Sequence, residues 1–214
     1  MKNHGLISDE WIVSYASGAL SEAHAMVVAS HCSFHPKLKG KIVDAENIGG
    51  ALMENSKPSL ISNHLFEDLM SKIDSLPIEE LKRSNDNGLP APLANYLDQP
   101  LDQLNWRMMG PGLSQVRLWT GPNDERLWLL KAKGGTKVPV HDHNGLEMTL
   151  VLKGSYHVGD DCYTSGMVEI ADHDTTNHMP LIDLGEDCIC LVVTEAPIKI
   201  HSRIGRLVQP FIGL

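Results

Sequence analysis

Two histidines and a glutamate in the stretch from Gly135 to Gly154 have the spacing of a metal site. His141 and His143 are two residues apart, and on a strand such residues project to the same side. The turn dipeptide Asn144-Gly145 follows, so we expect Glu147 to begin the returning strand of a hairpin, with its carboxylate facing both imidazoles. Two imidazoles and a carboxylate suit a divalent first-row metal, typically zinc or iron, and a fourth donor is expected from elsewhere.

The spacing of five fixed residues in this stretch resembles the first motif of the cupins. Gly135, His141, His143, Glu147 and Gly154 follow one another with five, one, three and six residues between them. A random window of this length rarely places five such residues correctly. The resemblance implies a jelly-roll β-barrel that holds a metal ion.

The cupin resemblance also implies a fourth metal ligand. In that family it is a histidine on a later strand, after a glycine and a bend, and the segment from Gly166 to His178 fits this place. His173 is nearer to the glycine but fits less well. Zinc is the first expectation for the ion, with iron, manganese and nickel as alternatives. The four expected metal ligands are therefore His141, His143, Glu147 and His178.

Short apolar stretches follow one another along the second half of the chain, at intervals of about ten residues with turn signals between them. This pattern predicts an all-β barrel. The absence of helical patterns between the stretches argues against a parallel α/β fold. The clearest predicted strands are residues 114–120, 125–132, 146–154, 187–194 and 206–213.

Helical patterns precede these strands. The first predicted helix runs from about Asp9 to residue 18 or 19, and the second from residue 21 to about Phe34. Weaker patterns cover residues 42–52 and 65–73. Three or four such helices would form a small bundle.

The composition changes between residues 75 and 99, where prolines and the turn cluster Ser84 to Gly88 interrupt the apolar periodicity. We expect the domain boundary here. The predicted organisation is multi-domain, an α-helical part joined to an all-β part. Its divisions are a helical bundle over residues 1–80, a linker over 81–100 and a cupin barrel over 101–214.

The charge and cysteine usage exclude several classes. With a net charge of -9 and no basic run, direct nucleic-acid binding is disfavoured. No window has the apolar length of a membrane span, and the start lacks a signal peptide, so a cytoplasmic protein is expected. The four cysteines are expected to be reduced, and Cys188 and Cys190 to be small buried side chains rather than redox groups.

Nearly the whole chain resembles the ChrR group of anti-sigma factors. The likeness is carried by residues 8–36, by residues 187–197 and by residues 206–213. The resemblance implies that a small helical domain, which normally holds zinc, binds and masks an extracytoplasmic-function (ECF) sigma factor. It also implies that the cupin domain is needed for release of the sigma factor under oxidative stress such as singlet oxygen.

The helical zinc site of that family departs from its pattern in this sequence. The family uses an N-terminal histidine followed by His-x3-Cys-x2-Cys, whereas Leu6, His31, His35 and Leu38 stand in those places here. Leucine cannot bind a metal.

Two interpretations of this departure stay open. His31 and His35 share a helix face, and His4 or Cys32 would complete a makeshift site. Otherwise the zinc site is lost and packing must hold the bundle. The side chains expected to do so are Trp11, Val27, Phe34, Ile42 and Leu52.

The expected function is an anti-sigma regulator whose barrel senses oxidative stress. One alternative is a metal-dependent cupin enzyme, such as a dioxygenase, with the helices as an appendage or dimerisation arm. Another is a ligand-binding cupin whose helices have lost sigma binding. Met148, His157 and Cys162 near the motif offer no obvious general base, which disfavours the enzyme. A homodimer stays open.

Overall fold

A computed structural model describes residues 4–77, 88–97, 99–122 and 124–201, with helices in the first part and strands in the second. The helices are α1 (Asp9–Ala16), α2 (Glu22–Phe34), α3 (Pro36–Glu54), α4 (Leu65–Ser75), α5 (Ala91–Tyr96) and the 3-10 turn η1 (Leu101–Gln103). The strands are β1 (Arg107–Gly110), β2 (Leu113–Thr120), β3 (Arg126–Ala132), β4 (His141–Asp142), β5 (Glu147–Lys153), β6 (Ser155–Val158), β7 (Asp161–Thr164), β8 (Val168–Ala171), β9 (Leu181–Ile182), β10 (Cys188–Thr194) and β11 (Lys199–Ile200).

The strands form an antiparallel barrel of the predicted all-β kind. Six of them form one sheet in the order β1-β2-β3-β10-β5-β8, and the facing strands pair as β7-β6-β9 and β11-β4. Four of the five clearest predicted strands are confirmed, as β2, β3, β5 and β10. The fifth, residues 206–213, lies outside the described residues.

The predicted hairpin between His141 and the strand at Glu147 is wrong. β4 pairs with β11, whereas β5 pairs with β10 and β8. The Asn144-Gly145 turn therefore carries the chain from one layer of the barrel to the other. Two hydrogen bonds of 3.0 Å hold the crossing to Glu195 on the neighbouring loop. The Leu146 N–H donates to the side-chain atom Glu195 Oε2, and the Leu146 carbonyl accepts from the Glu195 backbone N–H.

The central strands β3, β10 and β5 of the six-stranded sheet are largely buried on both faces, which explains why they are apolar almost throughout. On β5, Met148 and Leu150 face the helices while Thr149 faces the barrel interior. The same alternation runs along β3 and β10, so one strand side chain in two packs against α2.

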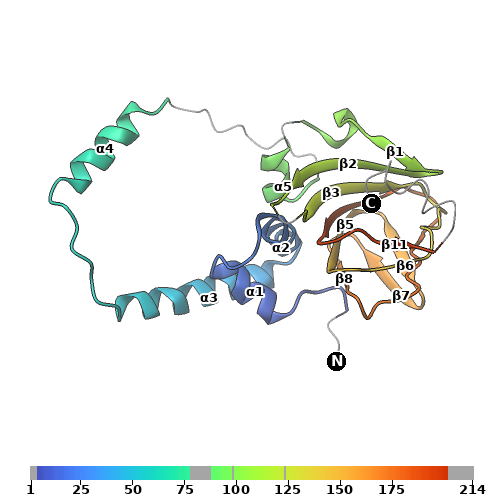
Figure 1. Cartoon of the computed structure of the whole chain (residues 1–214), viewed down its shortest axis with the longest axis horizontal. Coiled ribbons are helices and arrows are strands. Elements are labelled where there is room, and N and C mark those ends of the chain that lie inside the picture. Colours follow the sequence, from blue (N-terminus) through green and yellow to red (C-terminus); the bar gives the residue numbers. More distant parts are fainter. Residues whose placement is uncertain (1–3, 78–87, 98, 123, 202–214) are drawn as a thin grey trace.

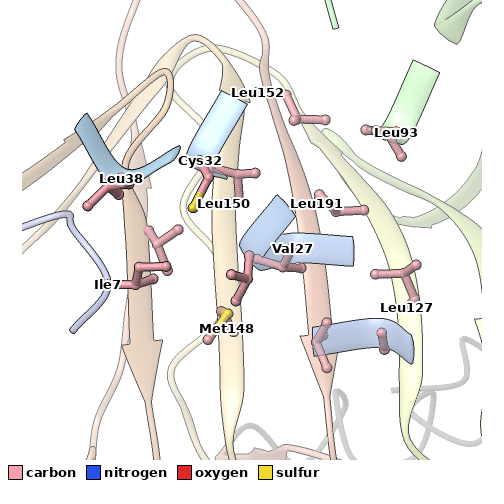
Figure 2. Close-up of a cluster of buried hydrophobic side chains, with 14 of the residues drawn as sticks. Ile7, Val27, Cys32, Leu38, Leu93, Leu127, Met148, Leu150, Leu152 and Leu191 are labelled. Carbon is pink, nitrogen blue, oxygen red and sulfur yellow. The ribbon is translucent and has the colours of Figure 1, made fainter. Parts of the chain in front are cut away.

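Helices α1 and α2 share a core with the sheet and do not form a bundle with a core of its own. Val27 and Cys32 on α2 are buried with Met148, Leu150 and Leu191 of the strands (Figure 2). The expected helical part is therefore present, and its core is continuous with that of the barrel. Trp11, Phe34 and Ile42 pack at its margin as expected, but Leu52 is 70% exposed, because the outer half of α3 extends beyond the sheet.

The outer half of α3 and the whole of α4 project away from the barrel (Figure 1). No residue of α4 is buried, although its sequence is amphipathic. The four predicted helices are confirmed, but α4 does not join the bundle. The helix α5 lies inside the stretch expected as a linker, and its Leu93 is buried against α2 and the sheet. The division of the chain into domains stays a prediction.

Among the described residues, no helix has the length and apolar character needed to cross a membrane.

Candidate metal centre

The structure brings the four predicted ligand side chains together. His141 lies on β4, His143 follows it, Glu147 begins β5, and His178 comes from the segment before β9. One ligand atom from each residue lies within 4.8 Å of the ligand atoms of the other three. All three imidazoles are buried.

Backbone pairing places His178 against His141. The two residues form an isolated antiparallel bridge, in which the His141 N–H donates to the His178 carbonyl at 3.1 Å and the reverse bond measures 2.9 Å. Their rings are 4.9 Å apart between centroids, and each lies 5.0 Å from the ring of His143. The three imidazoles thus form a nearly equilateral triangle, and His143 Nε2 lies 3.7 Å from Glu147 Oε1.

The hydrogen bonds of His141 and His143 leave one nitrogen of each ring free for a cation. His141 donates from Nδ1 to the Pro139 carbonyl at 2.8 Å, and His143 donates from Nδ1 to the Thr175 carbonyl at 3.4 Å. The Nε2 atom of each ring then carries the lone pair. His143 Nε2 is buried without a hydrogen-bond partner, which is costly unless a ligand completes it.

Glu169 on β8 fixes the orientation of the His178 ring by a hydrogen bond, and it was not predicted from the sequence. Its Oε1 accepts from His178 Nε2 at 3.0 Å, which leaves His178 Nδ1 as the lone pair that faces His141 Nε2 at 3.1 Å. Glu169 Oε2 accepts from the Tyr156 hydroxyl at 2.7 Å. The signal was a carboxylate between Val168 and Ile170 on an otherwise apolar strand.

Burial and the neighbouring side chains set the pKa values of His141, His143 and Glu147. Burial lowers the pKa of His141, so this imidazole is held neutral, the form that binds a metal. Burial alone would lower the pKa of His143, but the Glu147 carboxylate beside it raises the pKa overall. Burial would raise the pKa of Glu147, but the three imidazoles lower it, so the carboxylate stays ionised. The donor set of three imidazoles and a carboxylate fits a divalent cation such as zinc.

A cavity of about 480 Å³ adjoins this centre inside the barrel. His141, Glu147 and His178 line one part of it, and most of the remaining lining is apolar. Cys188 and Cys190 also line it. Both are buried free thiols, as expected, with their sulfur atoms 3.6 Å apart. The cavity has room for a small organic ligand next to the cation centre.

His31 and His35 face a backbone carbonyl rather than a set of metal ligands. His31 Nδ1 and His35 Nε2 each lie 2.8 Å from the Gly166 carbonyl oxygen on the barrel. Cys32 lies on the buried face of α2, and burial raises the pKa of its thiol to about 11, so the thiol stays protonated. His4 hydrogen-bonds the Cys162 carbonyl at 2.9 Å. The makeshift helical zinc site therefore does not assemble.

The remaining histidines considered above lie outside the centre. The side chain of His173 is 79% exposed, so it does not replace His178. His157 and Cys162 lie close to Asp183 on the barrel exterior. There the His157 ring already pairs with the Asp183 carboxylate at 2.8 Å, as expected for a hydrogen-bonded surface imidazole.

Comparison with known proteins assigns the barrel and the whole chain to the same relatives. Residues 99–197 match the family described as the ChrR cupin-like domain. The chain is 38% identical to the anti-sigma-E factor ChrR of Cereibacter sphaeroides over 206 residues, which is 96% of each chain. It also superposes, with a TM-score of 0.77 and 36% identity, on a chain of the crystal structure of Rhodobacter sphaeroides SigE in complex with the anti-sigma ChrR, covering 90% of this chain and 98% of that one.

Proposed function

Because the chain belongs to the ChrR family of anti-sigma factors, as its identity with ChrR over 96% of its length shows, we propose that it binds and masks an ECF sigma factor in the cytoplasm. The observation that carries this proposal is the match, over 90% of this chain, to one chain of a solved complex of a sigma factor with its anti-sigma partner. The regulator acts through a protein, since its net charge of -9 disfavours direct contact with nucleic acid.

The outer helices supply the surface for this partner. The apolar faces of α1 and α2 pack in the core shared with the sheet. The apolar faces without a partner are therefore those of α4 and of the outer half of α3. A row of exposed apolar side chains on a helix is typical of a binding site for another protein. The row on α4 consists of Leu65, Phe66, Leu69, Met70 and Ile73.

The charge of the chain favours the same class of partner. A chain with net charge -9 attracts a protein with a basic surface, such as the DNA-binding face of a sigma factor. Association is then fast at low salt and slows as salt screens the charges.

The barrel acts as the sensing module for oxidative stress. We place a divalent cation, zinc first, on His141, His143, Glu147 and His178. When bound, the cation would act as a Lewis acid toward a small oxidant or ligand in the adjoining cavity. The imidazoles around it hold their lone pairs toward the centre, and their outward N–H groups are fixed by hydrogen bonds.

Capture of the affinity-tagged full-length chain from its own cells tests this function. We expect mass spectrometry to identify an ECF sigma factor in near-equal amount, and metal analysis of the same sample to give about one divalent cation per chain. Capture of the chain without any sigma factor, from cells in which such factors are detected, would overturn the anti-sigma function. Metal content near zero would overturn the sensing centre alone.

A further inference from the structure

Polar contacts fasten helix α2 to the barrel at both of its ends. At the first end, the Ser21 hydroxyl donates to Glu125 Oε1 at 2.6 Å, and His24 Nδ1 lies 2.7 Å from the same atom. At the other end, His31 and His35 both reach the Gly166 carbonyl. The apolar core between these ends is non-directional, so the polar contacts fix where the helix sits.

The contact at Gly166 is closely defined. Neutral His31 donates from Nδ1 to this carbonyl and accepts from the Ile7 N–H at Nε2, at 3.5 Å, so its tautomer is set. The carbonyl oxygen has two lone pairs and can accept from both imidazoles. Gly166 has φ +87°, and a Cβ there would lie 3.0 Å from the side chain of Phe34, so only glycine suits this turn.

The Gly166 turn leads directly into β8, which also contacts the metal centre. At Val168 the backbone N–H donates to the Gly5 carbonyl at 2.9 Å, and the side chain packs in the core shared with α2. The next residue, Glu169, faces the barrel interior and holds His178 Nε2 at 3.0 Å. The four-residue segment 166–169 therefore contacts the helical part through Gly166 and Val168 and a proposed metal ligand through Glu169.

We propose that β8 couples the cation centre to helix α2, with Glu169 as a positioning residue for His178 and the Gly166 carbonyl as the contact that holds α2. With a cation bound, His178 would be a stronger donor from Nε2 to Glu169, and this bond would hold β8 in its present position. Removal of the cation weakens this hold and loosens the contact of Gly166 with His31 and His35. The inference rests on the cation centre of the proposed function.

Hydrogen–deuterium exchange on the full-length chain tests this coupling, with Zn²⁺ bound and after removal by a chelator. We expect cation removal to raise exchange about tenfold at the Val168 amide and in the last turn of α2. Metal content is measured on the same samples. If wild-type protein loses its cation and exchange at these positions is unchanged, or if it binds no cation at all, the proposal is overturned.

The Glu169→Gln variant separates coupling from simple proximity. His178 and Tyr156 donate to different oxygens of the Glu169 carboxylate, and an amide replaces one of these oxygens by an NH2 donor, so the variant keeps at most one of the two bonds. We expect its exchange at the last turn of α2 to be raised with the cation present, and to change less than twofold when the cation is removed. A response equal to that of the wild type would count against the proposal.

The His35→Ala variant tests the same coupling where Glu169→Gln fails to fold, because His35 is only partly buried. It should bind the cation as the wild type does, yet show raised exchange in the last turn of α2 in both states. Glu125→Gln is the matched control at the other end of α2, and there the response of the last turn should persist. The readout does not involve a sigma factor, so a chain that captures none can still show the coupling.

Discussion

His141 and His178 are joined by a pair of backbone hydrogen bonds of 3.1 and 2.9 Å, which bring one nitrogen of each ring to within 3.1 Å of the other. The backbone bridge fixes the distance between β4 and the segment before β9. The two imidazoles are consequently held together before any cation arrives, which lowers the entropy cost of binding it.

Replacing His178 by alanine should abolish binding of a divalent cation. The change removes one of four ligands and leaves Glu169 buried without its imidazole partner. Elemental analysis after dialysis should give about one cation per wild-type chain and less than about 0.1 per variant chain, since loss of one ligand costs several kcal/mol. His173→Ala is the matched control and should retain the cation. Equal cation content in both variants would show that the site lies elsewhere.

Leu69→Asp on α4 should weaken capture of the sigma factor about tenfold or more. Leu69 lies in the middle of the exposed apolar row, and a carboxylate there would have to be buried in the interface. The barrel should stay intact, because α4 contributes no buried residue.

Ser71→Asp is the control on the same helix. Ser71 points away from the apolar row, since it lies about half a turn of the helix from Leu69. Quantitative mass spectrometry of the captured sigma factor compares the two variants. Equal losses would mean that α4 does not present this face to its partner.

Val27→Ala on α2 should destabilise the barrel as well as the helices. Val27 is fully buried between α2 and the sheet, and the cavity left by the change should cost about 2 kcal/mol of unfolding free energy. Leu52→Ala, on the exposed part of α3, should cost less than about 0.5 kcal/mol. Denaturant unfolding followed by tryptophan fluorescence measures both. A barrel transition that Val27→Ala leaves unchanged would contradict the shared core.

Stability should fall in acid partly through His31. Burial, with His35 nearby, lowers the pKa of His31 from 6.5 to about 4, so the unfolded chain binds a proton that the folded chain does not. The contribution of His31 to the unfolding free energy is therefore complete above pH 6.5 and is lost as the pH falls toward 4. Below pH 4 no further loss comes from this residue. At about 1.4 kcal/mol per pKa unit it reaches roughly 3 kcal/mol.

The His31→Asn variant isolates this contribution. Asparagine keeps an N–H donor for the Gly166 carbonyl but does not titrate. Between pH 6.5 and 4 it should lose less unfolding free energy than the wild type, measured by denaturant titration at each pH. The same acid dependence in both proteins would show that other groups determine it.

The sequence predicted the local elements well and their packing less well. The cap before Asp9 and the proline at residue 36 predicted α1 and the end of α2, and the spacing from His141 to Glu147 predicted residues that the structure brings together. Whether they hold a cation is still a proposal. Helical periodicity reveals an apolar face without saying what covers it, so the sheet beneath α2 and the exposure of Leu52 were not predicted.

Contacts between segments that are distant along the chain could not be predicted from the sequence either. Nothing in the sequence placed Gly166 beside His31 and His35, because that contact depends on how the barrel meets the helix. The Asn144-Gly145 turn indicated a hairpin, yet the same turn chemistry serves a crossing between two layers.

Release of the captured sigma factor from the full-length chain under singlet oxygen tests the account most directly. The account predicts that the wild-type chain releases its partner, whereas the His178→Ala variant, which lacks the cation, still binds the sigma factor and retains it under the same exposure. Retention by the wild type, or equally fast release by both proteins, would contradict the claim that the cation centre controls the hold of the helices on their partner.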